Sequence, residues 1–101
     1  MVRVSQLHES GVQVWPVVND FKYDVDIEQL LSSKRLRQRM IKRLVSDAVD
    51  MNYDGINIDF EKITSSSSDD YLQFIRELSL ELRKNDKYLS VDVYPIEVYN
   101  A

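Results

Sequence analysis

The stretch Asp54-Gly55-Ile56-Asn57-Ile58-Asp59-Phe60-Glu61 decides the fold, because apolar and polar side chains alternate strictly along it. Such alternation indicates a strand with one apolar and one polar face. The apolar side chains share one face: Ile56, Ile58 and Phe60. The polar side chains share the other face: Asn57, Asp59 and Glu61. A strand is therefore predicted at residues 54–61, with three hydrogen-bonding side chains on one side.

Amphipathic helices are predicted on both sides of this strand along the chain. Ser32 or Ser33 caps a helix that runs to about Asn52. Its apolar residues form one stripe: Leu36, Met40, Leu44, Val45, Ala48 and Val49. The serine run 65–68 predicts a loop that leads into a second helix ending near Lys84. Its apolar residues also repeat at helical spacing: Tyr71, Ile75, Leu78 and Leu82.

Two further strands are predicted near residues 12–18 and 88–94, from their β-branched, aromatic and alternating composition. Pro16 fits poorly in a central strand because it has no backbone N–H to donate. Residues 19–31 are expected to be a polar connection, and a helix end closed by Gly11 is expected before the first strand. Long helices between the strands require parallel pairing by right-handed crossovers, so the chain is of the α/β class.

The polar face of the 54–61 strand is where chemistry is expected. In a closed barrel this face points inward, and its last residue reaches the carboxyl-end mouth, where active sites of (β/α)8 barrels lie. Glu61 is the residue nearest the mouth, and Asp59 lies roughly 6–7 Å behind it by strand rise. Burial and a neighbouring carboxylate both oppose ionisation, so one of the pair is expected to stay protonated near neutral pH. A general acid needs that property.

The octapeptide resembles the signature D-G-x-D-x-D-[WF]-E of family 18 glycoside hydrolases, which lies on barrel strand four. Residues 14–19 resemble strand three of that family, and residues 89–93 resemble strand five. The pattern with Asn57 and with phenylalanine before Glu61 is similar to that of the bacterial branch that contains spore-cortex N-acetylglucosaminidases. The resemblance implies that residues 1–101 are a partial catalytic barrel domain, about three βα units (strands three to five) of a (β/α)8 TIM barrel with parallel strands.

The resemblance also implies an activity and roles for individual residues. Chitinase-like members hydrolyse β-1,4-linked N-acetylglucosamine polymers, chitin or peptidoglycan, with retention of configuration and without a metal or cofactor. Glu61 would donate the proton to the glycosidic oxygen. Asp59 would orient the substrate's own 2-acetamido group, which attacks the anomeric carbon. Asn57, the third catalytic candidate, departs from the aspartate of many family chitinases, since an amide can hydrogen-bond Asp59 but cannot share a proton or charge with it. The parent protein is expected to be extracellular, cell-wall or spore associated.

Two strand-end residues, Asn19 and Tyr94, are expected to contact substrate, although each is equally compatible with a purely structural position. Trp15 is expected in the core rather than stacked on a sugar. Asp54 is expected to be structural, and His8 is expected to be an isolated surface residue. The acidic connection is expected to be solvated: Asp20, Asp24 and Asp26.

Composition and charge limit the classes of partner and site that the chain can have. The net charge is −4 and no basic stripe is present, so a nucleic-acid partner is not supported. No apolar run approaches the ~20 residues that span a bilayer, and no cysteine is available for a disulfide or thiolate site. An open piece of barrel exposes two strand edges, so self-association is expected. Family sites also use a tyrosine from later strands, so at most trace activity is expected from the isolated chain.

Two other functions remain open from the sequence. One is a non-catalytic, carbohydrate-binding barrel, against which Glu61 argues because such relatives commonly lack that glutamate. The other is a small α/β interaction domain whose acidic strand face is simply solvated. A calcium loop is disfavoured, because Gly55 is misplaced for the helix-flanked calcium pattern.

Overall fold

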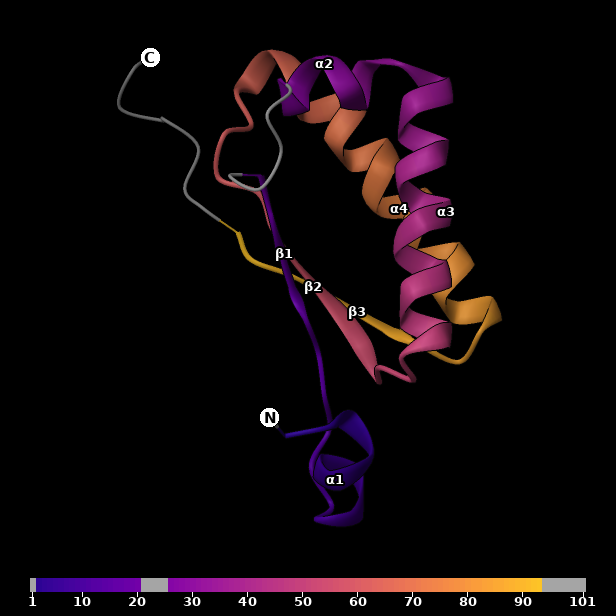
Figure 1. Cartoon of the computed structure of the whole chain (residues 1–101). Coiled ribbons are helices and arrows are strands. Elements are labelled where there is room, and N and C mark those ends of the chain that lie inside the picture. The colour runs from indigo at the N-terminus through magenta and orange to yellow at the C-terminus, as the bar shows by residue number, and fades with distance from the viewer. Residues whose placement is uncertain (1, 21–25, 94–101) are drawn as a thin grey trace.

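The computed structural model describes residues 2–20 and 26–93 of the chain. Figure 1 shows the element order: α1 Val4–Glu9, β1 Val17–Asn19, α2 Ile27–Ser32, α3 Lys34–Asp50, β2 Gly55–Asp59, the 3₁₀-helix η2 Ser65–Ser67, α4 Ser68–Lys84 and β3 Tyr88–Val91. Within these residues, no helix is long and apolar enough to cross a membrane.

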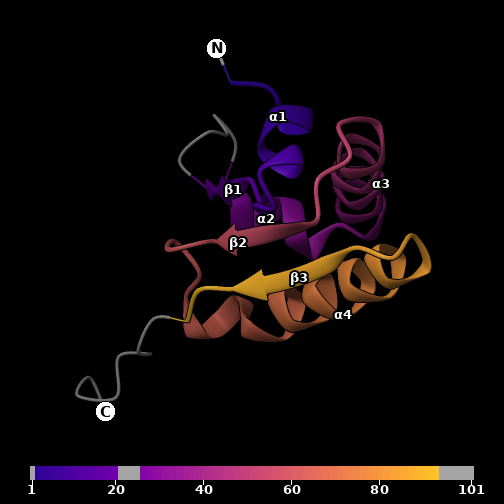
Figure 2. The ribbon, with the colours of Figure 1, turned by 90° about the horizontal axis from the view of Figure 1, so that it is seen from below.

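The three strands form one parallel sheet in the order β1-β2-β3, so β2 is central. The arrows point the same way in Figure 2, as right-handed crossovers through long helices require. In Figure 1, α3 and α4 cover one face of the sheet, while α1 lies beyond the amino ends of the strands. The carboxyl ends of the strands lie at the opposite end, towards α2. The predicted α/β class and parallel pairing are confirmed.

The predicted apolar face of β2 forms the centre of the core. Ile56, Ile58 and Phe60 are all buried and belong to one cluster with side chains of α2, α3 and α4. The ring of Phe60 stacks on Phe74 of α4, with centroids 5.7 Å apart. This packing leaves the other side of β2 free to carry the polar side chains.

The first strand is shorter than predicted, spanning Val17–Asn19 rather than 12–18. Pro16 has no N–H, and the N–H of Val14 donates to the Asp54 carboxylate at 2.6 Å instead of to a strand. The carbonyls of Val14 and Pro16 still accept from the backbone N–H groups of Asp54 and Asn57, both at 2.9 Å. The segment therefore runs beside β2 without being a full ladder strand.

Helix α2 was not predicted, because residues 19–31 were expected to be a polar connection. Asp26 caps this helix by accepting from the N–H of Glu28 at 3.0 Å, and both Ile27 and Leu31 are buried. A capping aspartate followed by apolar residues four apart was the available signal. The longer helices are confirmed, and Ser33 caps α3 by accepting from the Leu36 N–H at 3.2 Å.

Candidate functional site

The three polar residues of the central strand differ in exposure. Asn57 and Asp59 are half-buried, whereas Glu61 lies two residues beyond the end of β2 and is exposed. The expected burial of the carboxylate pair is therefore wrong for Glu61 within this chain. Asn19 pairs in register with Asp59, so the structure brings this predicted site residue beside Asp59. All three strands deliver their carboxyl ends to the same edge.

The side chain of Asn57 is held by the neighbouring strand. Its amide nitrogen donates to Ser90 Oγ at 2.7 Å and to Asp92 Oδ1 at 3.2 Å. The backbone N–H of Asp92 in turn donates to the carbonyl of Ile58 at 2.9 Å. Asp92 thus adds a third carboxylate to this face, which was not among the predicted site residues. Its alternation with Ser90 was the signal that placed it there.

The chain offers two aromatic residues, Trp15 and Tyr94, for contact with a sugar. Tyr94 lies outside the described residues. Trp15 is half-buried and stacks on Tyr88 with centroids 5.8 Å apart, next to Gly55 at the amino end of β2. A Cβ on Gly55 would come within 2.8 Å of the Trp15 ring and 2.7 Å of the Tyr88 carbonyl oxygen. Trp15 therefore packs at the end of the sheet opposite to Glu61.

The expectation that Asp20 is solvated is wrong. Asp20 directly follows β1 in the chain and is 1% exposed. Its Oδ2 accepts from the backbone N–H of Lys62 at 2.5 Å. Asp26 has its capping role, and Asp24 lies outside the described residues. No local pattern predicts the Asp20 contact, because its partner lies 42 positions away.

The expectation that His8 is isolated is also wrong. Its Nε2 lies 2.7 Å from Asp54 Oδ2, the same oxygen that accepts from the Val14 N–H. The Val14 N–H bond and the His8 side chain lower the pKa of Asp54. These contacts agree with the predicted structural role of Asp54, since they tie α1 and the segment before β1 to the start of β2.

Tyr71 is a site neighbour that sequence reasoning assigned only to the helix core. Its hydroxyl is buried with no hydrogen-bond partner among the described residues. Burial, together with the negative charges of Asp20, Asp59 and Asp92, raises the pKa of Tyr71 to about 12. The hydroxyl therefore stays protonated and able to donate towards this acidic region.

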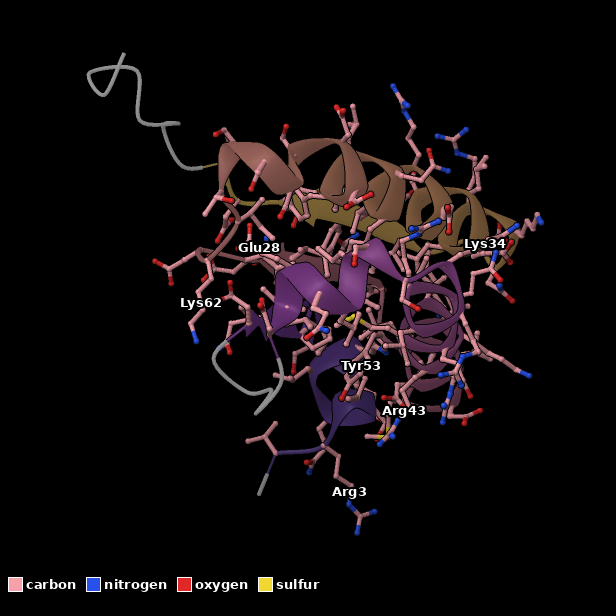
Figure 3. All side chains as sticks on the ribbon, turned by 90° about the horizontal axis from the view of Figure 1, so that it is seen from above. Arg3, Glu28, Lys34, Arg43, Tyr53 and Lys62 are labelled. Carbon is pink, nitrogen blue, oxygen red and sulfur yellow. The ribbon has the colours of Figure 1, made fainter. Side chains whose placement is uncertain are left out.

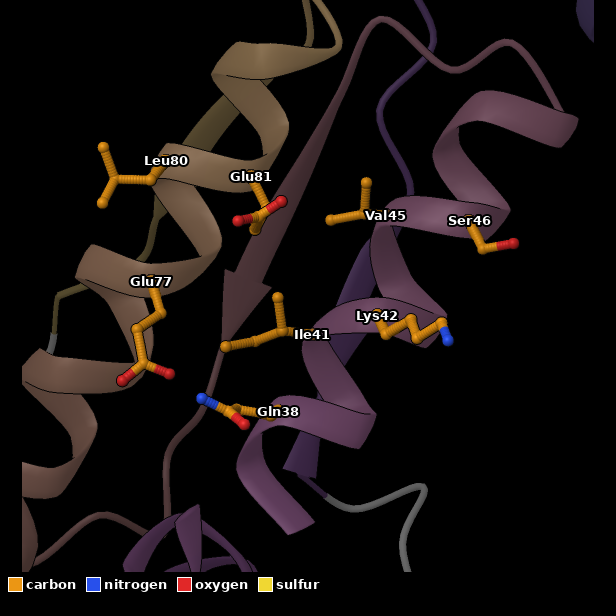
Figure 4. Close-up of a pocket in the computed structure, with 8 residues that line it drawn as sticks. All are labelled: Gln38, Ile41, Lys42, Val45, Ser46, Glu77, Leu80 and Glu81. Carbon is orange, nitrogen blue, oxygen red and sulfur yellow. The ribbon is translucent and has the colours of Figure 1, made fainter. Parts of the chain in front are cut away.

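A groove of about 590 Å³ lies elsewhere, between the outer surfaces of α3 and α4. Figure 4 shows its lining residues, among them Ile41, Val45 and Leu80, and none belongs to the acidic strand face. Within residues 2–20 and 26–93, no three side chains form a group that could hold a metal ion. The candidate site is the carboxyl edge of the sheet, where Asn57, Asp59 and Glu61 follow one another along β2 and just beyond its end.

Comparisons with known proteins show similarity in both sequence and fold. The model of glycosyl hydrolases family 18 matches residues 1–99. The uncharacterized glycosylase YvbX of Bacillus subtilis (strain 168) is 33% identical over 79 residues, which are 72% of this chain and 23% of that protein. A class V chitinase from Pseudomonas fluorescens Pf-5 superposes with a TM-score of 0.81 at 25% identity, covering 91% of this chain and 29% of that one.

The spore cortex-lytic enzyme SleL of Bacillus megaterium QM B1551 shares the fold, with a TM-score of 0.75 at 20% identity over 86% of this chain and 21% of its own. The chain thus spans between a fifth and a third of the length of each of these relatives. Its three parallel strands correspond to part of the barrel of chitinases. On sequence and fold together, the chain belongs to family 18 of the glycosyl hydrolases.

Proposed function

We propose that the protein to which this chain contributes is a glycoside hydrolase that cleaves β-1,4-linked N-acetylglucosamine polymers, with Glu61 as the acid. The observation that carries the proposal is the position of Asp59 and Glu61, on the uncovered face and at the carboxyl edge of β2. Family 18 membership and the chitinase and cortex-lytic names of its structural relatives support the substrate class.

In the proposed reaction the Glu61 carboxyl gives its proton to the glycosidic oxygen as the bond from that oxygen to the anomeric carbon breaks. The carbonyl oxygen of the substrate's 2-acetamido group forms the new bond to that carbon, and Asp59 orients the group. Glu61, now ionised, takes a proton from water as the water oxygen opens the ring formed by the acetamido group. Two inversions at one carbon retain its configuration.

The isolated chain is proposed to have at most trace activity and to self-associate. Within residues 2–20 and 26–93, the outer strands β1 and β3 each have one neighbour in the sheet. Val17 on β1 and Tyr88 on β3 are exposed apolar side chains at these edges. Unpaired parallel edges beside exposed apolar groups favour pairing with another chain. For the parent protein we propose an extracellular, cell-wall or spore-associated location, in keeping with a polymeric substrate.

A chimera tests the proposal directly. Residues 1–99 would replace the matching segment of the P. fluorescens chitinase, and fluorophore release from a chitooligosaccharide glycoside would be measured. We expect turnover that falls by about 10²–10⁴-fold in the Glu61→Gln variant, the usual contribution of a general acid. Glu9→Gln, at an exposed glutamate of α1, is the matched control and should keep full activity. Equal turnover by the folded chimera and by its Glu61→Gln variant would refute the role of Glu61.

A further inference from the structure

Two acidic side chains from the preceding βα unit hold the loop that follows Glu61. Asp20 Oδ2 accepts from the Lys62 N–H at 2.5 Å. Glu28 Oε2 accepts from the Thr64 N–H at 2.9 Å and from the Thr64 hydroxyl at 2.6 Å. Glu28 and Lys62 lie at the same end of the molecule in Figure 3. Residues 62 and 64 are thus each fixed through the backbone.

Among the described residues, sheet pairing does not extend to this loop. The β1–β2 pairing ends with Asn19 opposite Asp59, and the β2–β3 pairing ends with Ile58 opposite Val91. Glu61 therefore projects from backbone that lies beyond the ladder. The nearest described anchor after it in the chain is the bond between Lys62 and Asp20.

The burial of Asp20 indicates a specific role. An ionised carboxylate is costly to bury unless hydrogen bonds compensate for lost water. Asp20 is 1% exposed, yet its Oδ1 has no partner among the described residues, as is also true of the Tyr71 hydroxyl. Glu28 is differently placed: it is half-buried, and hydrogen bonds from Ser67 and Thr64 lower its pKa. The chain therefore keeps two carboxylates aimed at one short loop.

We propose that Asp20 and Glu28 are positioning residues, which hold the backbone after Glu61 so that its carboxyl meets the glycosidic oxygen. This inference rests on the proposed function, and neither side chain is assigned a contact with substrate. Misplacement of a reacting group by about 1 Å can cost roughly 10²-fold in rate. We call the hydrogen bonds of Asp20 to Lys62 and of Glu28 to Thr64 the clasp. Losing the clasp should consequently lower kcat more than it changes KM.

Backbone relaxation of the ¹⁵N-labelled chain tests the clasp without any need for activity. The backbone N–H order parameters of residues 61–64 should be about 0.85 in the unaltered chain and should fall below about 0.6 in Asp20→Ala. Asp20→Asn keeps an acceptor oxygen and should restore most of the rigidity. Asp69→Ala, at an exposed acid in the first turn of α4, is the matched control and should change nothing. Unchanged order in Asp20→Ala would overturn the clasp.

The same variants in the chimera test the consequence for catalysis. We expect kcat to fall by roughly 10–10²-fold in Asp20→Ala and Glu28→Ala with KM within about twofold, and to recover in Asp20→Asn. A mobile loop with unchanged kcat would overturn positioning and leave only a structural role. If Asp20→Ala does not fold, Glu28→Ala and Asp20→Asn give the same comparison. A folded but inactive unaltered chimera would refute the proposed function, while the relaxation data would still decide whether the clasp exists.

Discussion

Replacing Asn57 by aspartate restores the residue found in many family chitinases, and we predict that it destabilises this chain. Asn57 now donates to Asp92 Oδ1 at 3.2 Å and to Ser90 Oγ at 2.7 Å. A carboxylate can accept from the Ser90 hydroxyl, so that contact survives with its direction reversed. The contact with Asp92 changes from an attractive hydrogen bond to a pair of like charges.

The magnitude follows from the distance. Two unit charges 3.2 Å apart repel by about 1.3 kcal/mol at the dielectric constant of water and by about 5 kcal/mol at an effective value of 20. Asp92 is exposed, so the lower limit is the better guide. Adding the lost hydrogen bond, we expect Asn57→Asp to lower the free energy of unfolding at pH 7 by about 2 kcal/mol.

Urea denaturation of a double-mutant cycle measures this interaction. The cycle consists of the original chain, Asn57→Asp, Asp92→Asn and the double variant, each at pH 7 in low salt and in 1 M salt. The coupling between the two positions should be about 1–2 kcal/mol in low salt and should shrink in 1 M salt. A coupling below about 0.3 kcal/mol, or one independent of salt, would show that the two side chains do not repel each other.

Three further predictions concern stability and are measured by urea denaturation. Leu78→Ala removes a fully buried side chain of α4 and should lower the free energy of unfolding by about 3–5 kcal/mol. Leu80→Ala, at a residue 55% exposed on the same helix, should lower it by less than about 1 kcal/mol. Similar losses in the two variants would contradict the assigned core. Arg37→Met breaks two bonds to a carboxylate of α4 and one to a backbone carbonyl, and should cost about 2–4 kcal/mol, so a neutral change would contradict that network. Asp54 has a lowered pKa in the folded chain, so its ionised side chain contributes to the free energy of unfolding above the pKa of the unfolded state. That contribution is lost as the pH falls through the pKa of the folded state. Asp54→Asn should therefore flatten the loss of stability between about pH 5 and pH 2, and an unchanged slope would exclude that contribution.

The central strand and its helices were predictable because their signals are local. Strict alternation at 54–61 assigns one face to the core, and Ile58 is indeed fully buried. Ser33 lies directly before an amphipathic stripe and caps α3 as expected. The polar face of β2 and its place at the carboxyl edge follow from the same alternation and from parallel pairing.

The contacts that surround the site were not predictable, because they join distant positions. Asp20 meets Lys62 across 42 positions, His8 meets Asp54 across 46, and Asn57 meets Asp92 across 35. No periodicity in a single sequence reports which loops meet at a sheet edge. Composition alone made Asp20 look like a solvated loop residue, whereas its backbone partner keeps it buried.

The dependence on leaving group tests most directly the claim that Glu61 is the acid. The chimera and its Glu61→Gln variant would be compared on an unactivated chitooligosaccharide and on a dinitrophenyl glycoside, whose leaving group departs without a proton. We expect a loss of about 10²–10⁴-fold on the first substrate and a much smaller loss on the second. Equal losses on both substrates would contradict a proton-donating role for Glu61.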